Sequence, residues 1–391
     1  MDAKTDIVRS IVSSQSKNSS RIRPRAASAF LGLVAVAGPG LLAVLAALYT
    51  GRPSPVFLAL GLTLAVAILA CDGWIIARRR WITGSVALTS QIAFLFFLGG
   101  YAASPFPAPP PLSDPLPQAS SPASMAIYSL PTGVIHRTSA FAYRGGSPWK
   151  KWDSVMTAVL VRHPKGDVLI DTGVGRTVAS QLRDAPFLFQ LVSHLVPLQP
   201  AADQLDATGY DRKQLRFILL THAHWDHVSG VPDFPNVPVL VTAAEHRFID
   251  EGGWVTATAR GIDRSQLREY AFDGGPYLGF NRSHDLYGDG SIVIVPAPGH
   301  TPGSVVVFVT LPTGARYAFV GDLVWQREAI LEREGRPWAT SKIAGEDPVG
   351  VRDSMLRMSA IVTRYPQITI VPAHDGRGYA SIPEWSRLTS R

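Results

Sequence analysis

The sequence is short of cysteine and of charge. It has one cysteine, Cys71, among 391 residues, so no disulfide can form within the chain. Charged residues make up 17% of the chain, below the roughly 25% of an ordinary soluble protein, while 46% of residues are apolar. This composition excludes a disordered polyelectrolyte, and the mean hydropathy of +0.13 indicates membrane-associated segments.

Histidine is absent from the first 124 residues, and acidic residues are rare there. Residues 1–124 hold 10 Lys and Arg against 4 Asp and Glu, whereas residues 125–391 hold 27 against 26. The net charge of +7 therefore belongs almost entirely to the N-terminal part. The C-terminal part has no excess positive charge for a nucleic acid, which argues against such a partner. Because it contains all 10 histidines, the chemistry is expected there.

Long uncharged runs dominate residues 26–103. A membrane-spanning helix needs about 20 mostly apolar residues. We expect a membrane anchor of three transmembrane helices within 28–103, with spans near 28–50, 55–77 and 81–103. The alternatives are a cleaved signal peptide at the first run and buried helices of a soluble protein. The first run is longer than a usual signal-peptide core, and no clear cleavage site follows it.

The distribution of Lys and Arg predicts an orientation in the membrane. Residues 1–27 form a basic tail, and Arg78, Arg79 and Arg80 lie between the second and third spans. Because cytoplasmic segments collect positive charge, the N-terminus is expected in the cytoplasm and the C-terminal part outside it. In a bacterium with two membranes this is the periplasm, and the protein is expected in the inner membrane. Residues 104–124, with 8 prolines, are expected to be a semi-rigid linker with nothing to pack against.

Residues 125–391 show strands that occur in pairs and also alternate with helices. This arrangement is typical of an α/β sandwich in which helices cover the sheets. Strands are expected at 156–162, 167–170, 216–220, 237–241, 291–296, 304–311, 317–320 and 368–371. Helices are expected near 176–193, 242–250 and 347–364.

The clearest chemical signal is a cluster of histidines where an apolar strand ends. His222, His224, Asp226 and His227 fall within six residues directly after that strand. Imidazole and carboxylate groups so close together can converge on one metal ion. Without a metal they would repel one another once protonated. The alternative is a solvated polar loop.

With its later motifs, this segment resembles the metallo-β-lactamase-fold hydrolase superfamily. The resemblance covers roughly 125–391 and rests on several motifs in the family's order. These are Asp171-Thr172-Gly173, the His222–His227 signature, Pro298-Gly299-His300-Thr301-Pro302-Gly303-Ser304, Gly321-Asp322 and Pro372-Ala373-His374-Asp375. The fold that this implies is an αββα sandwich with two zinc ions at one edge.

The resemblance also implies a set of metal ligands. His222, His224 and His300 would hold one ion, Asp226, His227 and His374 the other, and Asp322 would bridge them. A hydroxide shared by the ions would be the nucleophile, with Asp226 and Asp322 as the catalytic carboxylates. Since no thiolate takes part, Mn²⁺ or Fe²⁺ could replace Zn²⁺. Asp171 is expected to orient a ligand, although a plain turn-forming aspartate is the alternative.

Within the superfamily, the sequence looks most like the N-acyl-homoserine-lactonase-type branch. Those enzymes open a lactone and usually carry a tyrosine three residues after the bridging aspartate. Here that position is Trp325, whose indole N–H can only donate, so the lactone substrate is in doubt. Trp225 and Trp325 are expected to line an apolar substrate pocket. The predicted function is the opening of a lactone or the cleavage of a carboxylic ester.

Other functions remain open on the sequence. A thioesterase of the glyoxalase II type shares the ligand set and is the runner-up. A β-lactamase is disfavoured by the bridging aspartate, and a phosphodiesterase by the scarcity of Arg and Lys beside the ligands. The non-enzymatic alternative is a zinc-binding membrane scaffold, against which the complete ligand set argues.

Overall fold

The computed structural model describes residues 103–183 and 185–388 and divides the chain into two compact units, Met1–Ala102 and Ala103–Arg391. The predicted spans lie outside the described residues except for Ala103. Within the described residues, no helix has the length and apolar character needed to cross a bilayer.

Two mixed sheets form the second unit. The first has seven strands in the order β4-β1-β2-β3-β5-β6-β7, and the other has five in the order β12-β11-β10-β9-β8. The strands are β1 (Ala126–Thr138), β2 (Lys151–Arg162), β3 (Asp167–Ile170), β4 (Leu195–Pro197), β5 (Leu215–Leu219), β6 (Val239–Thr242), β7 (Leu267–Tyr270), β8 (His284–Asp285), β9 (Ile292–Pro296), β10 (Val305–Thr310), β11 (Arg316–Gly321) and β12 (Ile368–Pro372).

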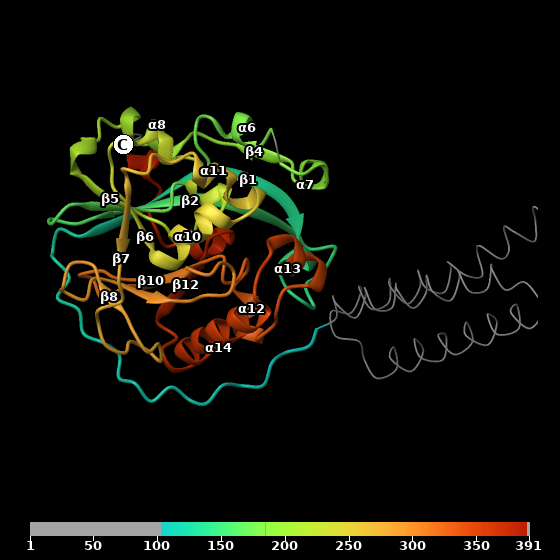
Figure 1. Cartoon of the computed structure of the whole chain (residues 1–391). Coiled ribbons are helices and arrows are strands. Elements are labelled where there is room, and N and C mark those ends of the chain that lie inside the picture. Colours follow the sequence, from blue (N-terminus) through green and yellow to red (C-terminus); the bar gives the residue numbers. More distant parts are fainter. Residues whose placement is uncertain (1–102, 184, 389–391) are drawn as a thin grey trace, which may run out of the picture. The chain divides into compact units, whose positions relative to one another are not determined.

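Helices cover the outer faces of both sheets. From top to bottom, Figure 1 shows α8, the β1–β2 strands, the β10–β12 strands and α14. The α-helices are α5 (Ser139–Ala142), α6 (Val178–Gln181), α7 (Phe187–Val192), α8 (Ala201–Ala207), α9 (Trp225–Val228), α10 (Ala243–Glu251), α11 (Ala257–Arg260), α12 (Glu328–Glu332), α13 (Trp338–Ala344) and α14 (Pro348–Arg364). The shorter 3-10 helices are Arg212–Gln214, Val231–Asp233, Trp254–Thr256, Gly376–Tyr379 and Trp385–Leu388.

Strand β10 shows why the domain has four layers. Its valines 305, 307 and 309 enter the core between the two sheets, while Val306 and Phe308 enter the core under α14. Successive side chains of a strand point to opposite faces, so an unbroken apolar run means that both faces of the sheet are covered. A third core joins α8, α10 and α11 to the outer face of the seven-stranded sheet. The predicted αββα sandwich is confirmed.

The structure adds elements that the sequence did not predict, among them β1, β4, β7, β8, α8, α12 and α13, and it divides one predicted helix. The long strand β1 was not expected, because Pro131 and Gly133 are poor strand residues. The structure accommodates both at a register shift between β1 and β2. The single helix expected at 176–193 is instead the short helices α6 and α7. Pro186 cannot continue a helix from its N-terminal side, and it directly precedes α7.

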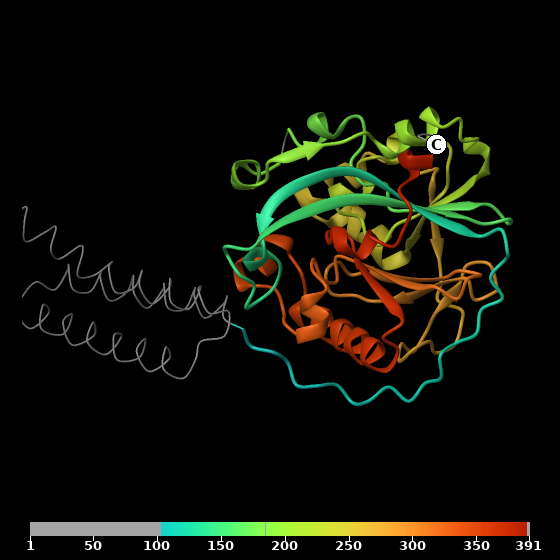
Figure 2. The ribbon, with the colours of Figure 1, turned by 180° about the vertical axis from the view of Figure 1, so that it is seen from behind.

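The proline-rich segment is not a spacer without contacts. Residues 103–124, here called the strap, run along the lower edge of the domain, below α14, to the start of β1 (Figures 1 and 2). Phe106 packs against the core under α14, and its N–H donates to the Arg333 carbonyl at 2.9 Å. Near the other end, the Ser121 hydroxyl donates to the Thr310 carbonyl at 2.6 Å. Apolar side chains between the prolines give the strap the packing partners that its composition did not suggest.

Candidate metal centre

The predicted ligands all follow the carboxyl ends of strands. His222 to His227 come after β5, and Asp322 comes directly after β11. His300 lies in the loop after β9, and His374 lies just beyond β12. In each sheet these strands run in one direction, so their ends meet at one edge of the sandwich. The structure thus brings all seven predicted ligands together.

Three overlapping groups make up the cluster, and within each group the candidate ligand atoms lie within 4.8 Å of one another. Asp322 is central. Its carboxylate oxygens lie 3.3 Å from His227 Nε2, 3.4 Å from His300 Nε2 and 3.1 Å from His374 Nε2. The groups are His222, His224 and His300; His222, His227 and Asp322; and Asp226, His227 and His374.

The donor atoms fit divalent metal ions. The Nε2 atoms of His222 and His227 and the Oδ1 atom of Asp322 are buried, and none has a hydrogen-bond partner within the described part of the chain. Leaving such atoms unpaired is costly. Nitrogen and carboxylate oxygen are donors that zinc accepts. The cluster could therefore hold divalent metal ions, and the family resemblance implies two of them with Asp322 as the shared ligand.

The electrostatics of the cluster differ from one side to the other. Burial and the neighbouring His227 lower the pKa of His222, and burial with His300 lowers the pKa of His224 to about 3. Burial also acts to lower the pKa of His374, but Asp322 and Asp226 outweigh it and raise this pKa to about 9. At neutral pH, His222 and His224 are therefore held neutral, whereas His374 favours its protonated form.

Asp171 holds the signature segment in place. One carboxylate oxygen accepts from the Thr221 N–H at 2.7 Å, and the other lies 2.8 Å from His227 Nδ1. Its φ of 51° is a left-handed conformation, which is uncommon for a residue other than glycine and is found at functional sites. With Nδ1 bound to Asp171, the free Nε2 of His227 faces the cluster. This is the role that the sequence predicted for Asp171.

Glu245 has a comparable role that the sequence analysis missed. Its buried carboxylate accepts from the Ala223 N–H at 2.6 Å, the Gly303 N–H at 2.9 Å and the Thr301 hydroxyl at 2.7 Å. It thus joins the loop of His222 and His224 to the loop of His300. Thr242 and Glu245 have the spacing of a capping box, which indicates the start of α10 but not this bridge.

Trp325 does not present its indole N–H to the pocket. Nε1 donates to Asp322 Oδ2 at 2.7 Å, so the donor orients the central aspartate. The indole stacks on Phe141, with ring centroids 5.3 Å apart, and the Arg336 guanidinium lies 4.2 Å from its ring centre. Arg336 also pairs with the buried Glu346 and donates to the Asp322 carbonyl. Only the ring of Trp325 is available to a substrate.

An apolar pocket of about 590 Å³ opens onto the cluster. Its walls come from β1, β2, α7, α9 and α13, and the predicted residue Trp225 is among them. Phe189 meets Trp225 edge to face at 5.7 Å. The apolar and aromatic lining residues are Ile135, Phe141, Met156, Pro186, Phe189, Trp225, Trp254, Val255, Trp325, Ile343 and Ala344. The pocket suits an uncharged, elongated group next to the metals.

Two cations in this pocket lie far from the ligands in sequence, so the motifs did not reveal them. Arg137 of β1 and Lys342 of α13 both line it. The Arg137 guanidinium lies 4.0 Å from the ring centre of Phe141 and donates to the Ser193 hydroxyl at 2.8 Å. Burial lowers the pKa of Arg137 to about 10, which still leaves it protonated at neutral pH.

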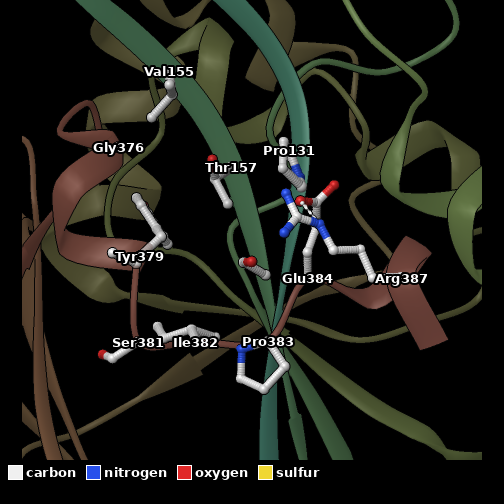
Figure 3. Close-up of a pocket in the computed structure, with 12 residues that line it drawn as sticks. Pro131, Val155, Thr157, Gly376, Tyr379, Ser381, Ile382, Pro383, Glu384 and Arg387 are labelled. Carbon is white, nitrogen blue, oxygen red and sulfur yellow. Dashed lines mark ion pairs between the residues drawn. The ribbon is translucent and has the colours of Figure 1, made fainter.

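A second hollow, of about 810 Å³, lies on the other side of β2 (Figure 3). Ser154 and Met156 face the cluster pocket, whereas Val155 and Thr157 face this one. Its lining residues include an ion pair between Glu384 and Arg387 at 3.0 Å but no histidine. The histidines of the domain that match no motif also lie outside the cluster: His136, His163, His194, His246 and His284.

The comparisons with known proteins agree with this fold and site. Residues 155–374 match the family model described as the metallo-beta-lactamase superfamily. A "Probable metallo-hydrolase" of Mycobacterium tuberculosis is 33% identical over 230 residues, which are 56% of this chain and 73% of that protein. The chain therefore belongs to the metallo-beta-lactamase superfamily and is a hydrolase of that class.

More distant relatives include lactonases. The N-acyl homoserine lactonase AttM of Rhizobium johnstonii is 29% identical over 181 residues, 44% of this chain and 67% of that protein. A mutant of AiiA from Bacillus thuringiensis, solved with N-decanoyl-L-homoserine at its active site, superposes with a TM-score of 0.52. It is 18% identical and aligns with 66% of this chain and 96% of its own, which supports the fold alone.

Proposed function

We propose that this protein is a membrane-anchored two-metal hydrolase that opens lactones or cleaves carboxylic esters bearing an apolar acyl group. The observation that carries the proposal is the apolar pocket that opens directly onto the His and Asp cluster. AttM is named an N-acyl homoserine lactonase, and a ligand of that kind has an apolar chain and a ring carbonyl. The lactonase relatives therefore support the same substrate class.

In the proposed reaction, the seven residues of the cluster would hold the two metal ions. His222, His224 and His300 would hold one ion, Asp226, His227 and His374 the other, with Asp322 shared between them. When bound, two divalent ions, proposed to be Zn²⁺, supply hydroxide at neutral pH and polarise the substrate carbonyl. Mn²⁺ or Fe²⁺ would suit the same donors.

The pocket walls would orient the substrate. Met156, Phe189 and Trp225 offer apolar surface to the acyl chain beside the cluster. Arg137 keeps a buried positive charge in the same pocket, which favours the carboxylate that forms when a lactone or ester is cleaved. Product formation thus creates a charge next to a cation that is already present.

Arg137 and Lys342 also favour a second candidate, a phosphodiesterase. Such an enzyme must bind an anionic substrate, usually through Arg or Lys, and both cations line the pocket. The apolar lining argues for the lactone or ester, because most of the wall surface offers no partner to a phosphate.

The test is a comparison of kcat/KM on the zinc-loaded full-length protein. We expect a medium-chain acyl lactone to be hydrolysed at least tenfold more efficiently than a bis-aryl phosphodiester, about 1.4 kcal/mol in barrier terms. The reverse preference would establish the phosphodiesterase. An equal or higher value for an acyl thioester would establish the glyoxalase II-like thioesterase. The Asp322→Ala protein is the control for background hydrolysis.

The membrane anchor and the location of the domain belong to the same proposal. The uncharged runs near 28–50, 55–77 and 81–103 support an inner-membrane protein with a cytoplasmic N-terminus and an extracytoplasmic catalytic domain. A reporter that is active only in the periplasm should be active when fused after residue 124 and inactive when fused after Arg80. The opposite pattern would place the catalytic domain in the cytoplasm.

A further inference from the structure

The docked strap determines where the chain leaves the catalytic domain. Ala103 lies against the loop after α5, since a Cβ built on Gly145 would come within 2.8 Å of the Ala103 Cβ. The next residue, Ser104, donates its N–H to Glu334 Oε2 at 2.9 Å. The strap is therefore held from its first residue, and the exit point lies between the α5 loop and the segment before α13.

The proposed third span covers residues 81–103. An extended chain reaches about 3.5 Å per residue, so a free linker over 104–124 would let the domain move tens of ångströms from a bilayer. With the strap bound to the domain from Ala103 onward, the proposed span would keep the domain close to the bilayer instead.

Two exposed tryptophans belong to the segments that hold the exit point. The Arg144 N–H donates to the Gly335 carbonyl at 2.9 Å, which joins the α5 loop to the segment before α13. Trp149 of this loop is 63% exposed, and Trp338, the first residue of α13, is 55% exposed. Large exposed apolar groups are unfavourable in water, and tryptophan is enriched at membrane interfaces.

The same edge is also basic and is continuous with the pocket mouth. Ile343, 56% exposed, and Lys342 belong to α13 and line the cluster pocket. Lys150 and Lys151 follow Trp149 and are exposed, and Lys150 Nζ lies 3.9 Å from Glu328 Oε1. Lysines close to a bilayer surface gain energy from anionic lipid headgroups. Aromatic groups, lysines and the pocket mouth therefore share one edge, here called the exit edge, formed by residues 144–151 and 335–344.

We propose that the exit edge rests on the surface of an anionic lipid bilayer, with the pocket mouth open toward the lipid. Trp149 and Trp338 would enter the headgroup region, and the lysines would contact lipid phosphates. A lipophilic substrate would then pass from the bilayer into the pocket without crossing water. The inference rests on the proposed membrane anchor and adds the orientation of the domain and the route of its substrate.

Lipid-quenching of single fluorescent labels tests the orientation. Full-length protein with Cys71→Ser is reconstituted into vesicles of phosphatidylcholine and phosphatidylglycerol and labelled at Trp338→Cys or Trp149→Cys. The control label is Lys213→Cys, an exposed position just before β5, at the opposite ends of the strands from the cluster. Brominated lipid should quench the labels at 338 and 149 at least threefold more than the label at 213. Equal quenching at all three positions would overturn the inference.

A kinetic comparison tests the substrate route. Trp149→Ser/Trp338→Ser should lower kcat/KM at least tenfold for a long-chain lactone presented in vesicles. It should leave the value for a short-chain, water-soluble lactone unchanged. Val196→Ser/Leu198→Ser removes two exposed apolar side chains from the seven-stranded sheet edge and should change neither value. Equal losses on both substrates in the tryptophan variant would show a folding defect and overturn the route.

The outcomes separate this inference from the proposal beneath it. A full-length protein that does not enter the vesicles would refute the anchor and the inference together. A protein that enters the vesicles and hydrolyses the short-chain lactone, with unquenched labels at 338 and 149, would leave the anchor and the activity standing. It would refute only the membrane-facing exit edge.

Discussion

The two sides of the metal cluster are built differently. His222, His224 and His300, the three-histidine side, are backed by Glu245 and by the Arg336–Glu346 pair. Asp226, His227 and His374, the mixed side, are backed by Asp171 and by the Val155 carbonyl, which lies 2.8 Å from His374 Nδ1. On the first side burial lowers the pKa values of His222 and His224, whereas on the mixed side carboxylates raise those of His227 and His374.

This difference shows how one edge of a fold can offer two unlike sites. Bound on the three-histidine side, a divalent ion would meet His222 and His224 as neutral imidazoles, because their pKa values are lowered. Bound on the mixed side, it would have to displace protons from His227 and His374, because metal ligands bind in their deprotonated forms. Asp322 lies between the sides and couples them.

The largest effect is expected from Asp322→Ala, which removes the group shared by both sides. Metal analysis should find both ions diminished, and kcat/KM for the best lactone should fall at least about 1,000-fold, about 4 kcal/mol. Asp353→Asn, at an exposed carboxylate on α14, is the matched control and should behave as wild type. Retention of two ions by the Asp322→Ala protein would contradict a shared position.

Substitution of a single ligand should remove one metal ion and leave the other bound. His300→Ala should lose the ion of the three-histidine side, and His374→Ala that of the mixed side, so each protein keeps about one ion. Activity should fall about 100-fold or more in both, since two-metal hydrolysis needs both ions. His284→Ala, a histidine paired with Asp273 outside the cluster, serves as the control. Loss of both ions from either variant would show that the sides cannot be filled independently.

Glu245 should make the stability of the metal-free protein depend on pH. Burial raises the pKa of Glu245 to about 7 from an unfolded value of 4.5. The folded state therefore binds more protons between these values, and the free energy of unfolding should fall as pH rises from 4.5 to 7. The loss is up to about 3 kcal/mol. The test is denaturant titration of the wild type and of Glu245→Gln in the presence of a chelator, at several pH values between 4.5 and 7. The free energy of unfolding should fall with pH more steeply in the wild type than in Glu245→Gln. The same pH dependence in both proteins would refute the prediction.

Asp171→Asn and Glu245→Gln should weaken opposite sides. Each replaces an oxygen that accepts hydrogen bonds with an NH₂ group facing a donor. Such supporting contacts are worth about 10–100-fold in metal affinity. Competition with a chelator should show that Asp171→Asn weakens mainly the ion of the mixed side and Glu245→Gln mainly the ion of the three-histidine side. If both variants weakened the same ion, the assignment of these supports would fail.

The smallest effect is expected from Trp325→Phe. The phenyl ring keeps the aromatic contact with Phe141 but removes the donor to Asp322, a loss of about 1.5 kcal/mol for a hydrogen bond to a charged group. We expect kcat/KM to fall about tenfold at unchanged metal content. A change in KM alone would place Trp325 in substrate binding.

The residues predicted as ligands lie together in the structure, whereas most of the pocket was not predicted, and the reason is physical. Ligand motifs are local, because a strand and the histidine loop after it lie in one continuous stretch of sequence, as His222 to His227 do. The pocket is non-local: Arg137, Phe189 and Lys342 come from three separate segments. No spacing rule links them, so neither cation could be assigned to the site.

The residues that hold the ligands in place were partly predictable from the sequence. Asp171 could be predicted because it ends a strand next to the signature strand. Glu245 and the Trp325 contact could not, since each depends on a side-chain direction that the sequence leaves open. The strap was misread because proline content describes stiffness and says nothing about the apolar Phe106, Leu112 and Leu116 between the prolines, which pack on the core.

The strap also has a consequence for the order in which this protein is made. It is synthesised before every segment that it contacts, including Gly279, Thr310, Arg333 and Tyr365. Tyr365 comes 251 positions after Asp114, the strap residue that it contacts, so the strap cannot be fully docked until Tyr365 has left the ribosome. Until then, residues 103–124 lack part of the contacts that hold them against the domain. Docking of the strap is therefore one of the last steps in the folding of this domain.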